Sequence, residues 1–379
     1  MVRCDTGLPT GTVGDPYASD VQSIPVLVQA GTGYDLLLSG PCIADKSTER
    51  RITAAADIRR RAEAIDDGAL VRAFAQIGRD PFINLIGFAH AKTEQPSAAA
   101  VVKAVRETDA REVLLSMVGY YRRAYRLATP PDIIRDAADG DRAAIREFQR
   151  SSYPHIGHWQ ATLRNLLGRP AVEVRGQLAD ALGRWHTEGF AEMEPEIDAA
   201  QRADAERVAA VAATRDFDDV LAQLIPGITF AQELGQSLAV LAPSTIIRPG
   251  WAMTDFGQTL VIAYPAEPTR VSPSEPPPRL VLIAKALGDE LRVRALRELR
   301  TGPLSGSELA RRMGVPRTSL QHHLGILVNA GLVRLATDDA RWGQLELRPE
   351  AIDELATLAN DWILDAGAAP QPPASGGSI

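Results

Sequence analysis

The chain has 379 residues and a formal net charge of −7, with apolar and charged fractions of 45% and 23% that are ordinary for a globular protein of two or three domains. No stretch reaches the roughly 20 uninterrupted apolar residues of a membrane-spanning helix, and the N-terminus lacks a signal-peptide layout, so a cytoplasmic protein is expected. Two cysteines, Cys4 and Cys42, are too few for a disulfide framework or a tetrathiolate metal site.

The first regular elements are a strand in the apolar run Ile24 to Ala30 and a short helix from Tyr34 to Leu38. Gly31 and Gly33 lie between them. Because Leu36 stands where a dinucleotide-binding fingerprint needs a third small residue, and no Gly-Lys-Ser or Gly-Lys-Thr follows, these glycines indicate a plain turn.

A long helical region follows, from about Ala54 to Leu224. Apolar residues such as Trp159 and Leu163 recur there at the helical period and are expected to form a core. Two extended runs come next, Leu238 to Arg248 and Gln258 to Tyr264, with turn residues between them. This pattern predicts a hairpin, with which the early strand could pair.

Composition marks the expected domain boundaries. Six prolines between positions 265 and 278 exclude a regular helix or a central strand and indicate a linker. The predicted parts are a flexible N-terminus (1–20), a mostly helical effector or dimerisation domain with a small sheet (21–264), the linker (265–278), a winged helix-turn-helix domain (279–366) and a disordered tail (367–379). The expected fold class is therefore mainly α with small β elements.

The charge is divided unevenly along the chain. Residues 279–348 hold 12 basic and 7 acidic residues, a net charge of +5, which leaves −12 for the remainder. An acidic body joined to a basic module suits a protein that binds nucleic acid, although charged helical surfaces also serve solubility alone.

The C-terminal module has the layout of a helix-turn-helix. Ser305 and Glu308 have the spacing of a capping box, Gly314 is placed to end that helix, and a second helix is predicted from Arg317 to Asn329. An earlier helix, capped by Asp289, is expected to precede this pair.

The predicted Arg317–Asn329 helix has two different faces. At about 100° per residue, its leucines share one face and its polar or small residues share the other, namely Thr318, His322, Gly325 and Asn329, with Gln321 on the flank. Side chains of this kind fit a major groove, where they reach base edges. His323 lies nearer the apolar side and is expected to be structural.

A β-hairpin wing is predicted from Leu332 to Thr337 and Gln344 to Arg348, followed by a closing helix from Ala351 to Leu364. Arginines of the wing are placed to reach phosphates, Arg348 among them. The predicted DNA-contacting residues are Arg317, Thr318, Ser319, Gln321, His322, Arg334 and Arg341.

The module resembles the arsenic-repressor-type (ArsR-like) winged-helix family. The resemblance rests on Ala286-Leu287-Gly288-Asp289-Glu290-Leu291-Arg292, Leu304-Ser305-Gly306-Ser307-Glu308-Leu309-Ala310, Leu320-Gln321-His322-His323-Leu324, and Ala330-Gly331-Leu332-Val333. It implies a cytoplasmic, nucleoid-associated homodimer on a double-stranded, pseudo-palindromic operator, with repression relieved by an inducer in many members. The family's dimer interface would correspond to Leu280–Leu287 and Ala351–Leu364.

The chain also departs from that family. The cysteine or histidine ligands of its metal sensors are absent here, and Gly325 replaces a lysine that many members carry. The long helical region before the linker is similar in layout to the N-terminal regions that are fused to this module in some actinobacterial regulators.

Three roles for the helical domain remain open: a small-molecule effector domain, a scaffold for dimerisation only, or a metal-binding or enzymatic domain. His155 and His158 have a ligand-like spacing but no nearby acidic or cysteine partner in the sequence. No catalytic motif and no cofactor-binding motif is recognised, so the chain is expected to be a regulator and not an enzyme.

Overall fold

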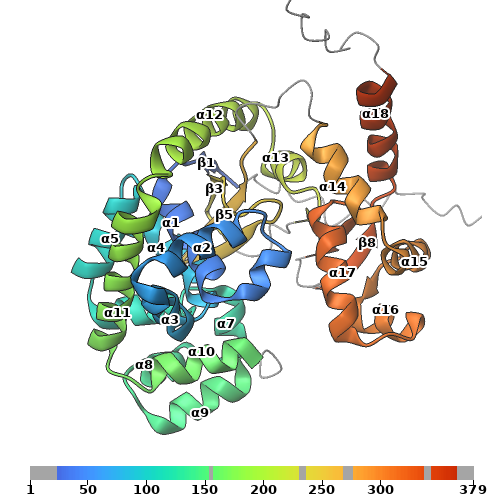
Figure 1. The fold of residues 1–379 in the computed structure, drawn as a ribbon. Helices are drawn as coiled ribbons and strands as arrows, with labels where there is room; N and C mark the ends of the chain where they lie inside the picture. The colour runs from blue at the N-terminus through green and yellow to red at the C-terminus, as the bar shows by residue number, and fades with distance from the viewer. Residues whose placement is uncertain (1–23, 153–156, 230–235, 268–275, 337–342, 365–379) are drawn as a thin grey trace, which may run out of the picture.

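The computed structural model describes residues 24–152, 157–229, 236–267, 276–336 and 343–364. Its fold is mainly helical with two small sheets, as the sequence predicts. Figure 1 shows a large helical body and a smaller C-terminal module at its side.

The body is built from short helices packed around a shared apolar core. Their order is α1 (Thr32–Ala44), η1 (Lys46–Arg50), α2 (Ala55–Ala64), η2 (Asp66–Gly68), α3 (Ala69–Ile77), α4 (Asp80–Lys92), α5 (Ala98–Glu107), α6 (Ala110–Met117), α7 (Arg123–Ala128), α8 (Pro131–Ala138), α9 (Arg142–Ser151), α10 (Gly157–Leu167), α11 (Ala171–Trp185), the π-helical turn η3 (His186–Phe190), α12 (Glu194–Ala212) and α13 (Phe217–Leu224). Trp159 and Leu163, predicted as core, are buried.

A four-stranded sheet lies inside the body in the order β1 (Val26–Val28), β3 (Leu238–Ser244), β5 (Thr259–Pro265) and β4 (Ala252–Phe256). Successive side chains of a strand point to opposite faces. Val240 and Ala242 accordingly join the main helical core, whereas Ala239 and Leu241 pack with residues of α12 and α13. Both faces are covered, which explains why β3 and β5 are continuous apolar runs without alternation.

The predicted hairpin is wrong in its pairing. β3 and β5 run parallel, and the hairpin forms instead between β4 and β5, whose Phe256 and Thr259 are opposite each other. The sequence placed Asp255 and Phe256 in a turn because Gly257 follows them, yet the turn begins only after Phe256. The expected pairing of the early strand with this sheet is confirmed, since β1 pairs with β3.

The C-terminal module contains α14 (Pro278–Leu287), α15 (Glu290–Leu299), β6 (Leu304–Ser305), α16 (Gly306–Met313), α17 (Arg317–Asn329), β7 (Val333–Ala336), β8 (Gln344–Leu347) and α18 (Glu350–Leu364). These elements enclose an apolar core of their own. The helix-turn-helix and the two strands of the wing occur where the sequence predicts them.

A strand of the body joins the module's sheet, which the sequence did not predict. β2 (Ile228–Thr229) pairs in parallel with β7, so the second sheet has the order β2, β7, β8, β6. At Gly227, a Cβ atom would lie 1.9 Å from the carbonyl oxygen of Val328, so the close approach of the two backbones requires glycine there.

Among the described helices, none is both long and apolar enough to cross a membrane.

Candidate nucleic-acid interface

The helix-turn-helix is positioned by a tight corner between α14 and α15. Asp289 caps α15 by accepting a hydrogen bond from the backbone N–H of Arg292 at 3.0 Å, as predicted. The Arg292 guanidinium donates to the carbonyl oxygens of Ala286 at 2.6 Å and Lys285 at 2.9 Å, which would otherwise lack partners at the end of α14. This corner fixes the direction in which α15 enters the module.

The predicted capping box at the start of α16 is confirmed. The Ser305 hydroxyl accepts from the Glu308 backbone N–H at 3.2 Å, and the Glu308 carboxylate accepts from the Ser305 backbone N–H at 3.0 Å. The backbone N–H and the hydroxyl of Ser305 both donate to the Glu308 carboxylate and hold its pKa below its usual value. Gly314 ends α16 with a φ of 67°, a left-handed conformation that glycine adopts without strain.

The two faces of α17 have the composition that the helical period predicts. Leu320, Leu324 and Leu327 are buried in the module's core. The exposed residues along the helix are Arg317, Thr318, Ser319, Gln321, His322 and Gly325, while Asn329 is half-buried. A continuous polar surface on a helix anchored by leucines is therefore available to a ligand.

The two histidines of α17 differ in their surroundings. His323 is half-buried, as expected for a residue near the apolar side, and its Nδ1 lies 3.4 Å from an oxygen of Asp289 without forming a hydrogen bond. His322 is exposed, and its pKa is lowered by partial desolvation and by the positive charges of His323, Arg50, Arg292 and Arg51. A neutral His322 offers one hydrogen-bond donor and one acceptor.

Among the described residues of the wing, fewer arginines are exposed for phosphate contacts than the sequence predicts. Arg334 on β7 is half-buried, and Arg341 lies outside the described residues. Arg348 does not face outward as predicted, because its Nη1 donates to the carbonyl oxygen of Gly331 at 2.7 Å and its Nε is buried. Burial lowers the pKa of Arg348 as well. This arginine fastens the wing to the end of α17.

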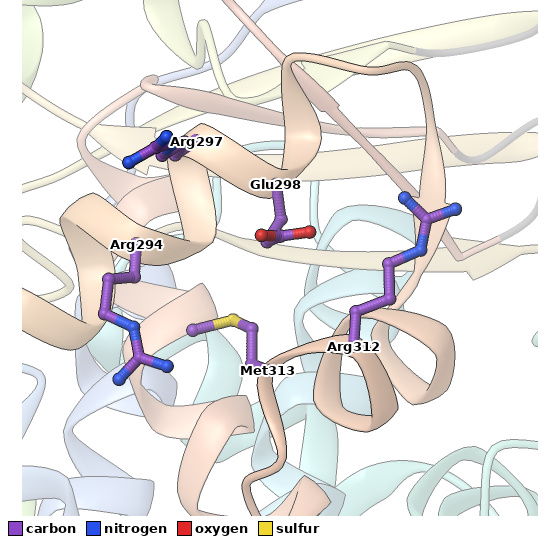
Figure 2. A pocket seen from close by; sticks show the side chains of 5 residues that line it. All are labelled: Arg294, Arg297, Glu298, Arg312 and Met313. Carbon is purple, nitrogen blue, oxygen red and sulfur yellow. The ribbon is translucent and has the colours of Figure 1, made fainter.

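A hollow of about 260 Å³ lies between α15 and α16 and was not found from the sequence. Arg294, Arg297 and Arg312 surround it together with Glu298 and Met313, as Figure 2 shows. Arg312 also donates to the Thr301 hydroxyl at 3.2 Å. Three guanidinium groups against one carboxylate add to the positive charge of the module, and the i, i+3 spacing of Arg294 and Arg297 was the signal in the sequence.

The candidate sites in the body have structural explanations. A Cβ atom on Gly31 or Gly33 would lie 2.5 Å from Pro96, so the loop before α1 is packed against protein. His158 contacts Arg79 and lies 3.8 Å from a carboxylate oxygen of Asp80, whereas His155 lies outside the described residues. In the part of the chain that the structure describes, no three histidine, cysteine or acidic side chains form a metal-binding group.

Comparison with known proteins supports the helix-turn-helix. A family model described as a helix-turn-helix domain matches residues 287–336, which include α15, α16, α17 and β7. In the comparisons with curated proteins and with solved structures, nothing matches the chain.

Proposed function

We propose that the protein is a cytoplasmic transcriptional regulator that binds a double-stranded DNA operator through α17, its recognition helix. The observation that carries the proposal is the continuous exposed polar face of α17 above its buried leucines. A helix with short polar side chains can enter a major groove and bring those side chains to base edges. The match of residues 287–336 to a helix-turn-helix family model supports the same function.

Some exposed residues of α17 are proposed to contact base edges and others to contact phosphates. Arg317 and Gln321 have the side chains that pair in a bidentate manner with guanine and adenine, and His322 can donate to or accept from a base edge. Thr318 and Ser319 lie in the first turn, where hydroxyl groups commonly bind phosphate. Arg334 and Arg341 of the wing are proposed to bind phosphates beside the groove.

We assign the module to the ArsR-like winged-helix family and propose that the protein acts as a repressor in the form of a homodimer. Support for dimerisation comes from α18, on which Ile352, Ile363 and Leu364 are 43%, 71% and 71% exposed. Exposed apolar side chains on one helix mark a surface that a partner covers. The partner proposed here is α14 and α18 of a second copy.

The body is proposed to bind a small-molecule effector that changes the affinity for DNA. Its support is the pairing of β2 with β7, because a change in the body would move the edge of the wing. A thermal-shift screen of metabolites tests this role, since a ligand at 100 times its dissociation constant stabilises a protein by about 2.7 kcal/mol.

The double variant Arg317→Ala with Gln321→Ala tests the recognition helix. Both side chains are exposed, so the fold should be retained while specific binding falls by about 30-fold or more, at 1–3 kcal/mol for each bidentate contact. A fluorescence-anisotropy titration on the chain's own promoter fragment measures the loss. Arg146→Ala with Gln223→Ala, two exposed residues of the body, is the matched control. Specific binding that survives in a folded recognition-helix variant would contradict the assignment.

A further inference from the structure

The segment that follows η1 is connected to the end of the recognition helix through the loop between β3 and β4. The backbone N–H of Thr53, just after η1, donates to the carbonyl oxygen of Arg248 at 2.9 Å. Gly250, two residues after Arg248, lies against the end of α17, since a Cβ atom on Gly250 would be 3.7 Å from Nδ2 of Asn329. Figure 1 shows α17 on the side of the module that faces the body. These contacts bring the segment just after η1 near the C-terminal end of α17.

A second connection fixes this arrangement. The Leu335 backbone N–H on β7 donates to the carbonyl oxygen of Gly227 at 2.8 Å, next to the β2–β7 pair. Pro226 packs against Gly331, where a Cβ atom would be 2.8 Å from the proline ring. The body therefore touches the module at the wing and at the C-terminal end of α17, and two separated contacts restrict rotation between the two parts.

Two arginines of the body project next to this contact. Arg50 and Arg51 are both exposed, and within the described residues neither forms an ion pair with a carboxylate. Asp45, the acidic residue that precedes η1, is already paired with Arg79 at 2.9 Å. Neither guanidinium is therefore used in an ion pair inside the described chain, although the carboxylates of Asp45 and Asp80 act on the charge of Arg51 from a distance.

Positive charge from the body acts on the ring of His322. After partial desolvation, the charges of Arg50 and Arg51 in the body and of Arg292 in the module contribute to lowering its pKa. This is notable in a chain whose net charge is −7. The body, although acidic as a whole, thus presents positive charge where it borders the recognition helix.

We propose that Arg50 and Arg51 bind backbone phosphates of the same duplex that α17 reads, so that the body completes the DNA interface. This inference rests on the proposed function. A helix in the major groove, which is about 12 Å wide, has a phosphate backbone on each side. Arginines near the C-terminal end of α17 are placed to meet one of these backbones, and phosphate contacts of this kind fix the register of a protein on DNA.

The salt dependence of binding tests the inference in the full-length chain. Each phosphate neutralised adds about 0.9 to the slope of log K against log [salt] for B-DNA. The variant Arg50→Gln with Arg51→Gln should show a slope shallower by about 2 and binding about tenfold weaker, on operator and unrelated DNA alike. The matched control is Arg142→Gln with Arg146→Gln on α9, exposed residues at the far end of the body.

The outcomes separate this inference from the proposed function. If wild type binds its promoter fragment and both variants keep the wild-type slope, the contribution of the body is refuted while DNA binding by α17 stands. Tighter binding by the Arg50/Arg51 variant would also overturn it, because the body would then shield α17. If wild type binds no duplex, both the inference and the proposed function fail. A shallower slope in the Arg50/Arg51 variant alone supports the inference.

Discussion

Single side chains in the module act mainly through the backbone groups that they satisfy. The caps made by Asp289 and Ser305 could be predicted from the sequence because each partner lies within three residues. Arg348 could not be predicted, because the carbonyl oxygen to which it donates is 17 positions away, in Gly331. At this scale, a residue's role is readable from the sequence when its partners are local.

The ion pair between Arg279 and Glu354 makes the stability of the module depend on pH. Arg279 donates to both oxygens of Glu354, at 2.6 and 2.8 Å, and joins α14 to α18. These hydrogen bonds lower the pKa of Glu354. A carboxyl group whose pKa is lowered on folding stabilises the protein above its unfolded pKa of about 4.3, and this contribution disappears as the pH falls through the folded value.

Replacing Glu354 with glutamine should therefore lower the free energy of unfolding at pH 7 by about 1 kcal/mol or less, since the pair is partly exposed and screened by solvent. The difference from wild type should shrink as the pH falls below about 4. Chemical unfolding at both pH values measures it, with Asp361→Asn, an exposed acidic residue on the same helix, as the control. A difference that stays constant with pH would exclude this role for Glu354.

At the scale of elements, helices were easier to predict than strand partners. The α17 boundaries, Arg317 and Asn329, agree with the sequence prediction because Pro316 before the first turn, Gly331 after the end and the leucine period all specify them locally. The pairing of β3 with β5 was mistaken for a hairpin, and the pairing of β2 with β7 was missed altogether. Strand pairing depends on contacts far apart in sequence, which local patterns do not contain.

The contact between β2 and the wing should depend on Gly227. In a Gly227→Ala variant, the methyl group would meet the backbone carbonyl of Val328, which cannot move without shifting α17. Overpacking of this kind costs about 1–3 kcal/mol. The Leu335 amide, which donates to Gly227, should then lose protection in hydrogen exchange.

The control for this variant is Gly176→Ala on α11, where a Cβ atom would meet nothing within 4 Å. Inside a helix this change should stabilise the chain by about 0.5–1 kcal/mol. If the Leu335 amide of Gly227→Ala keeps wild-type protection, β2 does not hold the wing.

At the scale of the whole molecule, the relevant features are the division of charge between the body and the module and the contacts that join them. The acidic body and the basic module share a sheet through β2 and β7, while residues 268–275 of the predicted linker lie outside the described residues. Which residues of the body border α17 could not be predicted from the sequence, because the approach of Gly250 to Asn329 and the β2–β7 pair join residues that are far apart in the chain. The division of charge between body and module was visible in the sequence alone.

If the chain dimerises through α18, variants of that helix should change the mass of the particle in solution. Ile352→Asp with Ile363→Asp alters side chains that are exposed in the single chain, so the variant should fold but fail to pair. Sedimentation velocity should give twice the chain mass of 40.8 kDa for wild type and the single chain mass for the variant. Leu127→Asp with Val172→Asp, which are 70% and 64% exposed on the body, should remain dimeric. A wild-type protein that sediments as a single chain would rule out this interface.

The most direct test of the account is the affinity of the full-length chain for its own promoter fragment compared with a scrambled duplex of the same length and composition, at about 0.15 M salt. Reading by α17 predicts tighter binding to the promoter by a factor of about 1,000 or more, the lower end of the range for specific DNA-binding proteins. Equal affinity for the two duplexes, or none for either, would contradict it.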